Sequence, residues 1–528
     1  MTHQCRCCGM MVAIKPTKYR PLLTIAQVGR QLDTIVTIGH GTPASIFNEP
    51  KLFGAAHAVS DKSMEDSWAS ELTGRSILEG VSRHFTSGAM QYRIMDADCL
   101  PDVPFDVGEM YAGEMPIKAG VKSKELFFVF QPTIGAPVDE ITIWLNGGPG
   151  CSSLEGFFQE NGRFLWTEGT PAPYINQNSW VNLTNMLWVE QPVGTGYTVG
   201  TATAKSEEEI ANDFVGFLEN FENTFGIKDF KIYVTGESYA GRYVPYISAA
   251  ILNKKNTALF NLKGALVYDP CIGQFDYVQE QVPAVPFVQA NQQFFNFDSS
   301  FMSNIESLHK SCGYDNFITK YLKFPPPGIQ PHMTGPSSQC DVFNMINNKA
   351  TQVNPCFNIY EVNQTCPTPS DQLSGTSPYF DRADVKKALH APSNSQWSEC
   401  SNKAVFTGGN AGPEHEGDIS LDSIQKVLPQ VIAATNRVLV ANGDYDMIII
   451  TNGTLLSIQN MTWGNALGFQ SPPVTPINIP SQGQMGIQHY ERGLMWAETY
   501  KSGHMGPEYQ PLVAYRHLLW LLGKIETL

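Results

Sequence analysis

The sequence predicts an α/β fold with a central, mostly parallel sheet covered by helices on both faces. Short apolar segments rich in β-branched and aromatic residues alternate with longer segments whose apolar residues recur every three to four positions. Strands that alternate with helices favour parallel pairing, because a crossover helix returns the chain to the same edge of the sheet. Apolar residues make up 42% of the chain and charged residues 16%, which is typical of a globular protein.

Six apolar segments are predicted to be strands, namely 126–131, 141–145, 186–190, 231–235, 265–268 and 438–441. Residues 207–225 carry a stripe of apolar side chains with helical spacing, which includes Ile210, Phe214 and Phe221. A second helix is predicted from Tyr239 to about Asn253. These elements together form the predicted α/β core.

The domain prediction divides the chain in two. Residues 1–85 show no sustained periodicity and are predicted to be an N-terminal extension, whereas 86–528 form the folded domain. Residues 272–380 are rich in Pro, Asn, Gln and Phe and interrupt the alternation of strands and helices. We therefore expect an insertion over the top of the sheet, after which the chain returns to the α/β pattern.

Charge and hydropathy exclude two classes of partner. The formal net charge is −15, and a nucleic-acid surface needs a basic patch instead. No apolar run reaches the roughly 18–20 residues that span a bilayer. We expect neither a nucleic-acid partner nor a membrane span.

Cysteines and glycosylation sequons predict a secretory-pathway protein, extracellular or vacuolar. Besides Cys5, Cys7 and Cys8, eight cysteines are widely spaced without a C-x-x-C pair, which favours disulfides over zinc. Four of the eight are expected to cross-link the insertion. They are Cys312, Cys340, Cys356 and Cys366. Sequons occur at Asn182, Asn363, Asn452 and Asn460. Residues 1–40, however, contain no clear signal peptide.

The segment GESYAG (236–241) predicts a nucleophilic serine. It follows one predicted strand and precedes a helix, which is the context of the nucleophile elbow. The tight turn requires small residues two positions before and after Ser238, and Gly236 and Ala240 meet this requirement. The backbone N–H of Tyr239 would then lie at a helix N-terminus, where it can bind an oxyanion.

A base and an orienting acid follow in the order that this fold uses. Asp446 lies in the loop after a predicted strand, and His504 lies in SGHM (502–505) near the C-terminus. Ser238 would attack, His504 would take and return its proton, and Asp446 would hold the imidazole tautomer. Asp444, in the same GDYD run, is the competing acid.

Several motifs resemble those of the serine carboxypeptidases, particularly the fungal members. They are WLNGGPGCSS (144–153), EQPVGTGY (190–197), GESYAGRYVP (236–245), YFDRADVKKALHAP (379–392) and SGHM (502–505). The resemblance covers about residue 110 to the C-terminus and is weakest in the insertion. It implies the α/β-hydrolase fold with a cap, and removal of C-terminal amino acids from peptides and proteins.

The resemblance also implies roles for particular residues. Ser238, Asp446 and His504 match the catalytic triad, and Gly148 and Tyr239 match the two oxyanion donors. The group that holds the terminal carboxylate of the substrate matches Asn146, Gly147, Glu160 and Glu237. No metal or organic cofactor is implied. A disulfide between Cys151 and Cys400 is implied too, but Cys99 is a rival partner of Cys400, which would leave Cys151 for Cys271.

The carboxylate-binding group has a chemical consequence that holds without the resemblance. Glu237 can approach a substrate carboxylate only in its neutral form, because two adjacent carboxylates repel. We therefore expect an acidic pH optimum. Gly506 stands where the family usually has a larger apolar residue, so the wall near the leaving residue is expected to differ.

Two alternatives use the same scaffold. An esterase or acyltransferase would share the triad but has no need for Asn146, Glu160 and Glu237. A catalytically silent binding protein of the same fold would not need the complete triad. Release of a free amino acid from a blocked dipeptide separates carboxypeptidase from esterase, and labelling of Ser238 by a fluorophosphonate separates both enzymes from a binding protein.

Overall fold

The structure is a computed structural model that describes residues 88–94, 100–333, 335–408 and 417–528. The predicted extension at 1–85, with Cys5, Cys7 and Cys8, lies outside the described residues, and so does Cys99. The boundaries of the predicted domains therefore stay a prediction.

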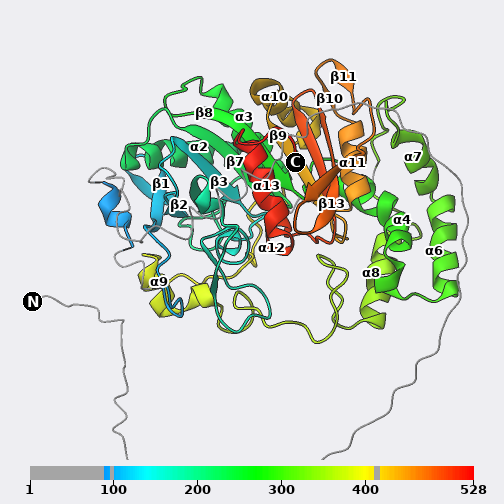
Figure 1. Ribbon diagram of the computed structural model, residues 1–528, viewed down its shortest axis with the longest axis horizontal. Coiled ribbons are helices and arrows are strands. Elements are labelled where there is room, and N and C mark those ends of the chain that lie inside the picture. The colour runs from blue at the N-terminus through cyan, green and yellow to red at the C-terminus, as the bar shows by residue number, and fades with distance from the viewer. Residues whose placement is uncertain (1–87, 95–99, 334, 409–416) are drawn as a thin grey trace, which may run out of the picture. The chain divides into compact units, whose positions relative to one another are not determined.

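A ten-stranded sheet forms the centre of the fold, in the order β1-β2-β6-β3-β7-β8-β9-β14-β13-β12 (Figure 1). The strands from β6 to β14 pair in parallel, and the pairs at both edges are antiparallel. The strands are β1 (Tyr111–Lys118), β2 (Val121–Gln131), β3 (Glu140–Leu145), β6 (Asn185–Glu190), β7 (Lys231–Glu237), β8 (Asn261–Tyr268), β9 (Val438–Gly443), β12 (Thr475–Ile479), β13 (Gly483–Glu491) and β14 (Leu494–Thr499). Two short hairpins add β4 (Phe164–Leu165) with β5 (Tyr174–Ile175) and β10 (Thr462–Trp463) with β11 (Ala466–Leu467). All six predicted strands are confirmed, as is the mostly parallel sheet.

Both predicted helices are confirmed, as α2 (Glu207–Phe225) and α3 (Ala240–Asn253). The other α-helices are α4 (Val282–Ala290), α5 (Gln292–Phe295), α6 (Ser299–Ser311), α7 (Tyr314–Tyr321), α8 (Val342–Val353), α9 (Ala383–Ala388), α10 (Val427–Thr435), α11 (Thr451–Gln459), α12 (Gly506–Tyr509) and α13 (Pro511–Leu521).

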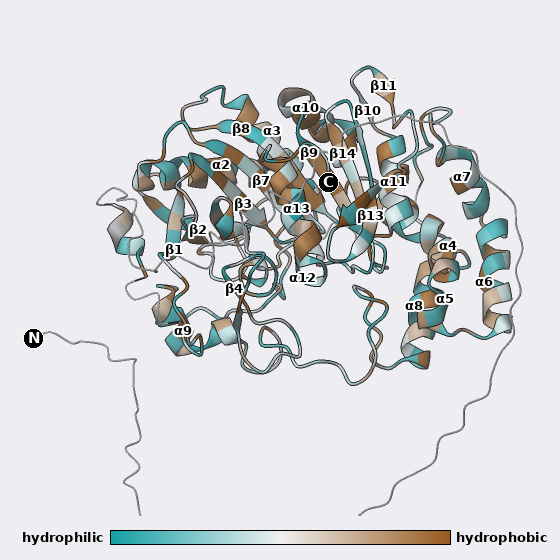
Figure 2. Cartoon of the chain, viewed as in Figure 1, coloured by the Kyte–Doolittle hydropathy of each residue, from teal (hydrophilic) through white to brown (hydrophobic). Residues whose placement is uncertain are grey.

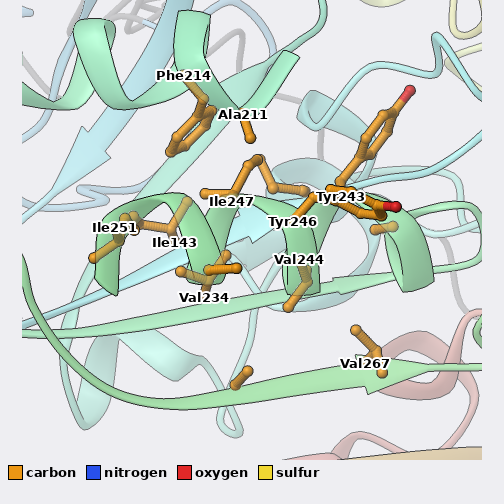
Figure 3. Close-up of a cluster of buried hydrophobic side chains, with 14 of the residues drawn as sticks. Ile143, Ala211, Phe214, Val234, Tyr243, Val244, Tyr246, Ile247, Ile251 and Val267 are labelled. Carbon is orange, nitrogen blue, oxygen red and sulfur yellow. The ribbon is translucent and has the colours of Figure 1, made fainter. Parts of the chain in front are cut away.

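The sheet separates two hydrophobic cores, because successive residues of a strand point to opposite faces. In β9, Val438 and Val440 join the core that contains α2, α3 and α10, whereas Leu439 and Ala441 join the core that contains α13. Hydrophobic residues accordingly follow the central strands (Figure 2). Figure 3 shows α3 lying between the sheet and α2, with Val244 directed toward the strands and Ile247 among the neighbouring apolar side chains. This packing holds the N-terminus of α3, and hence the turn before it, in a fixed position.

The insertion is helical and contains α4 to α8. The disulfides Cys312–Cys340 and Cys356–Cys366 cross-link it, as predicted. Its hydrophobic core continues into the main domain through Met447, Ile450 and Leu456. The insertion therefore packs against the loop that carries Asp446.

The antiparallel edge formed by β12, β13 and β14 was not predicted as strands. β13 has a mixed pattern of exposed and buried residues, without the regular alternation that marks a strand. Pairing with β9 on one side of β14 and with β13 on the other satisfies its backbone, which short-range patterns do not reveal.

Candidate active site

Ser238 lies on a sharp turn between β7 and α3. Its φ of 61° is in the left-handed region, and its N–H donates to the Tyr268 carbonyl at 2.9 Å. A Cβ on Gly236 would lie 2.2 Å from the Leu145 carbonyl oxygen and 2.8 Å from the Ala240 Cβ. The predicted requirement for small residues around the serine therefore has a direct steric cause.

His504 and Asp446 form a buried pair at the same edge of the sheet. The Nδ1 of His504 lies 2.8 Å from the Oδ2 of Asp446. Asp446 also accepts the N–H groups of Ile448 and Ile449, at 2.8 and 3.2 Å. Within the described part of the chain, the Nε2 of His504 is buried and has no hydrogen-bond partner. The pair thus leaves one imidazole nitrogen available for a proton transfer.

The segment that follows β8 links this pair to the serine. The N–H of Cys271 donates to the Ser238 carbonyl at 3.0 Å. Asp269, two residues before Cys271, has a carboxylate oxygen within 4.8 Å of side-chain atoms of both Asp446 and His504. The three predicted triad residues therefore border one short segment. Asp444, the competing acid, instead accepts the Ser502 N–H at 3.3 Å.

The two predicted oxyanion donors have free N–H groups among the described residues. Neither Gly148 nor Tyr239 donates a backbone hydrogen bond there. Gly147 explains how their segments come together, since a Cβ at Gly147 would lie 2.5 Å from the Tyr239 nitrogen and 2.7 Å from the Ser238 Cβ. Gly148 is exposed and has a φ of 108°, which a side chain rarely adopts.

Asn146 joins the carboxyl groups that the sequence singled out. Its Nδ2 lies 2.9 Å from the Oε1 of Glu237 and 3.2 Å from the Oε1 of Glu160. The indole N–H of Trp144 donates to the Asn146 Oδ1 at 2.7 Å, which fixes the orientation of the amide. Asn146, Glu160 and Glu237 thus form one buried cluster, and Glu237 immediately precedes Ser238.

Burial raises the pKa of Glu160 well above its usual value, and the nearby charge of Glu237 raises it further. Burial, followed by the charge of Glu155, likewise raises the pKa of Glu237 well above its usual value. Each carboxyl accepts from the Asn146 amide through Oε1, and the Oε2 of each is buried without a hydrogen-bond partner in the described residues. In the described residues neither carboxyl forms an ion pair. The pair therefore holds protons at mildly acidic pH.

Glu155 belongs to the same cluster but was not predicted from the sequence. Its Oε2 lies 3.3 Å from the Asn146 Nδ2. Glu155 immediately precedes a π-helical turn, Gly156–Glu160, which brings both ends of that turn to one amide. In a regular α-helix Glu155 and Glu160 would point in different directions, so no sequence pattern predicts this contact.

Cys151 and Gly506 lie close in sequence to Gly148 and His504, respectively. Cys151 pairs with Cys400, as the resemblance implied, whereas Cys271 is buried and free. The alternative pairing of Cys151 with Cys271 is therefore wrong. Gly506 lies against Tyr268, because a Cβ there would lie 2.7 Å from the Tyr268 ring.

The sequence and structure of this chain are similar to those of known carboxypeptidases. The family model described as serine carboxypeptidase matches residues 101–524. The serine-type carboxypeptidase F of Aspergillus niger is 61% identical over 83% of this chain and 87% of its own length. A probable serine carboxypeptidase of Arthroderma benhamiae is 43% identical over 84% of this chain and 88% of its own length.

A solved structure gives the same result. The prohormone-processing carboxypeptidase Kex1(delta)p of Saccharomyces cerevisiae superimposes with a TM-score of 0.65 and 25% identity, over 83% of this chain and 96% of the other. No described helix is long and apolar enough to cross a membrane. Because both the family model and the relatives cover most of the chain, this protein belongs to the serine carboxypeptidase family of α/β-hydrolases and is a serine-type carboxypeptidase acting on peptides.

Proposed function

We propose that Ser238, Asp446 and His504 hydrolyse the last peptide bond of peptide and protein chains, and that Asn146, Gly147, Glu160 and Glu237 hold the terminal carboxylate. The observation that carries this proposal is that the carboxyls of Glu160 and Glu237 both accept from the amide of Asn146, and that Glu237 immediately precedes Ser238. An esterase has no need of neutral acids beside its nucleophile.

The first half of the reaction forms an acyl-enzyme. The Oγ of Ser238 attacks the scissile carbonyl, and its proton passes to the Nε2 of His504. Asp446 stabilises the imidazolium through Nδ1. The N–H groups of Gly148 and Tyr239 donate to the oxyanion. His504 then protonates the leaving amine, the C–N bond breaks, and the terminal amino acid departs.

The second half returns the enzyme to its initial state. A water molecule gives a proton to His504 and attacks the ester carbonyl. The ester bond to Ser238 breaks, and the serine recovers a proton from His504. No cofactor enters this proposal, because the nucleophile, the base and the oxyanion donors are residues of the chain.

An acidic pH optimum follows from the carboxyl pair. The raised pKa values of Glu160 and Glu237 keep both groups neutral at acidic pH, so they donate hydrogen bonds to the carboxylate of the substrate. As the pH rises through these pKa values, each lost proton places a negative charge beside that carboxylate. Affinity is therefore present at low pH and is lost with increasing pH.

The experiment is release of free amino acid from an N-blocked dipeptide at about pH 4–5, the range expected from carboxyl pairing. Ser238→Ala and His504→Ala should each lower kcat by on the order of a million-fold, since triad members act together. Labelling by a fluorophosphonate should be lost in Ser238→Ala. Substantial turnover in His504→Ala would contradict the assigned base.

We also propose a secretory-pathway location, extracellular or vacuolar, with N-glycans at the sequons. The three disulfides found in the described part of the chain support this location, because disulfides persist in oxidising compartments. Of the four sequon residues, Asn363 is exposed and Asn182, Asn452 and Asn460 are half-buried. Asn363 is therefore the position with most room for a glycan.

A further inference from the structure

Asp269 is a fully buried acid that the catalytic assignment leaves without a role. It follows the C-terminal end of β8 directly and is 0% exposed. Its φ of 40° lies in the left-handed region, where a side chain is strained and glycine is favoured. A buried, ionisable side chain at such a position costs stability twice, through backbone strain and through desolvation. Its presence calls for a specific interaction.

One oxygen of Asp269 is held by the end of β9. Its Oδ1 accepts the Gly443 N–H at 2.8 Å and the Asn442 amide at 3.1 Å. Its backbone N–H donates to the Ala441 carbonyl at 2.7 Å. These bonds fix the plane of the carboxyl group. They leave Oδ2 as the oxygen that can interact elsewhere.

The second oxygen faces the catalytic acid. No N–H or hydroxyl group of the described residues donates to the Oδ2 of Asp269. A carboxylate oxygen of Asp269, one of Asp446 and a ring nitrogen of His504 lie within 4.8 Å of one another, and all three residues are buried. Asp446 in turn accepts the Nδ1–H of His504. The three side chains therefore form one buried cluster, in which the Oδ2 of Asp269 is the oxygen that can approach Asp446.

The other titratable groups near Asp269 are acids or phenols. Besides Asp446 and His504, the groups near enough to respond to a charge on Asp269 are Glu237 at the end of β7 and Tyr268 beside it. The charge of Asp446 acts on Tyr360 and Glu361 from the insertion. No Lys or Arg forms an ion pair with Asp269 in the described residues. Burial, followed by the charge of Asp446, raises the pKa of Asp269 well above its usual value.

We propose that Asp269 is a positioning residue that remains protonated and donates a hydrogen bond from its carboxyl to Asp446, so that the catalytic imidazole stays neutral at lower pH. The proposal rests on the triad assigned above. A neutral donor withdraws negative charge from Asp446, and a less negative Asp446 stabilises the imidazolium less. His504 then remains a base in the acidic range where the Glu160–Glu237 pair binds substrate.

Two variants distinguish a hydrogen-bond donor at position 269 from a negative charge at that position. Asp269→Asn is isosteric, and its amide oxygen can accept from Asn442 and Gly443 while its NH₂ donates to Asp446. Asp269→Gly removes the donor and suits the positive φ. Both are tested through the acid limb of kcat/KM for a blocked dipeptide. The acid limb of fluorophosphonate labelling gives a second measure that involves no terminal carboxylate, and thermal unfolding reports folding.

The expected result is an acid limb close to wild type in Asp269→Asn and one shifted upward by about one pH unit in Asp269→Gly, the usual size of an effect from one hydrogen bond to a charged group. A downward shift in Asp269→Asn would mean that Asp269 is ionised and would overturn the proposal. An unshifted limb in folded Asp269→Gly would overturn it as well. His504→Ala distinguishes these outcomes from failure of the triad, because that failure would leave His504→Ala active.

Discussion

Replacing the carboxyls of Glu160 and Glu237 tests the substrate-binding proposal, because the pH dependence of KM reports how many protons substrate binding requires. The carboxylate of the substrate, with a usual pKa near 3.5, is ionised throughout the working range. Both Glu160 and Glu237 are buried, at 1% and 3% exposure, so an unscreened charge on either opposes binding. Each proton lost above its pKa should raise KM tenfold per pH unit, or about 1.4 kcal/mol.

The limiting slope of log KM against pH therefore depends on the number of carboxyls present. We expect a slope of about two for the wild type, about one for Glu237→Gln or Glu160→Gln, and about zero for the double variant, since one proton contributes one unit. The glutamine at position 237 keeps an acceptor for the Asn146 amide, which lies 2.9 Å from Oε1. The change thus removes a titration with little loss of packing.

The assay measures KM and the inhibition constant of an N-blocked amino acid, because the inhibition constant reports binding without chemistry. The same peptide with a C-terminal amide is the control substrate, and its KM should not change with the protonation of Glu160 and Glu237. Glu222→Gln is the matched control variant, as Glu222 is a buried carboxyl of α2 whose pKa is raised by burial to about 9. A Glu237→Gln profile that coincides with the wild type would refute the reasoning.

Three further predictions follow from single observations. Gly147→Ala should lower kcat by about 10²–10³-fold and also weaken substrate binding, because its Cβ would lie 2.5 Å from the oxyanion donor nitrogen of Tyr239 and Gly147 belongs to the proposed carboxylate-binding group. Steady-state kinetics check this, and wild-type kcat would contradict it. The melting temperature should be higher at pH 5 than at pH 8, because burial raises the pKa of Glu190 to about 7 and of Glu361 to about 8. The folded state then holds protons that the unfolded state releases above about pH 4.5. The free energy of unfolding therefore falls as the pH rises, by up to about 1.4 kcal/mol per pH unit for each group. An equal or higher melting temperature at pH 8 would argue against these pKa assignments. Mass spectrometry of glycopeptides should find Asn363 occupied, and an unmodified Asn363 in secreted protein would contradict the expectation from its exposure.

The sequence predicted the parts of the fold that local patterns specify. The strand before Ser238, the helix after it and the small residues around it are fixed by contacts within a few positions of each other. The triad acid was chosen between Asp444 and Asp446 through the resemblance, and the hydrogen bond that His504 donates to Asp446 supports this choice. Strands β6, β3, β7, β8 and β9 were recognisable because both of their faces are buried.

The remaining features depend on contacts between distant segments. Glu155 reaches Asn146 through a π-helical turn, and Asp269 reaches Asp446 because β8 and β9 are neighbours in the sheet. Eight cysteines allow 105 pairings, so the Cys151–Cys400 disulfide could come from resemblance but not from spacing. Asp269 did carry one recognisable signal, since an acid directly after a strand lies at the edge where active sites form.

Two carboxyl pairs on one sheet edge are expected to limit activity from opposite sides of the pH scale. Loss of a proton from Glu160 or Glu237 weakens substrate binding as the pH rises, which appears in KM. Protonation of His504 stops nucleophilic attack as the pH falls, and the hydrogen bond from Asp269 to Asp446 moves that limit downward, which appears in kcat/KM and in the labelling rate. Because Glu237 and Asp269 also influence each other electrostatically, charging either one makes the other harder to ionise. A neutral Asp269 therefore leaves the pKa of Glu237 lower than a charged one would. The pH range of activity is then set by the balance between the two pairs. In the double variant of Asp269→Gly with Glu237→Gln, the shifts of the acid and alkaline limbs of the pH profile should equal the sum of the single effects only if that electrostatic coupling is negligible.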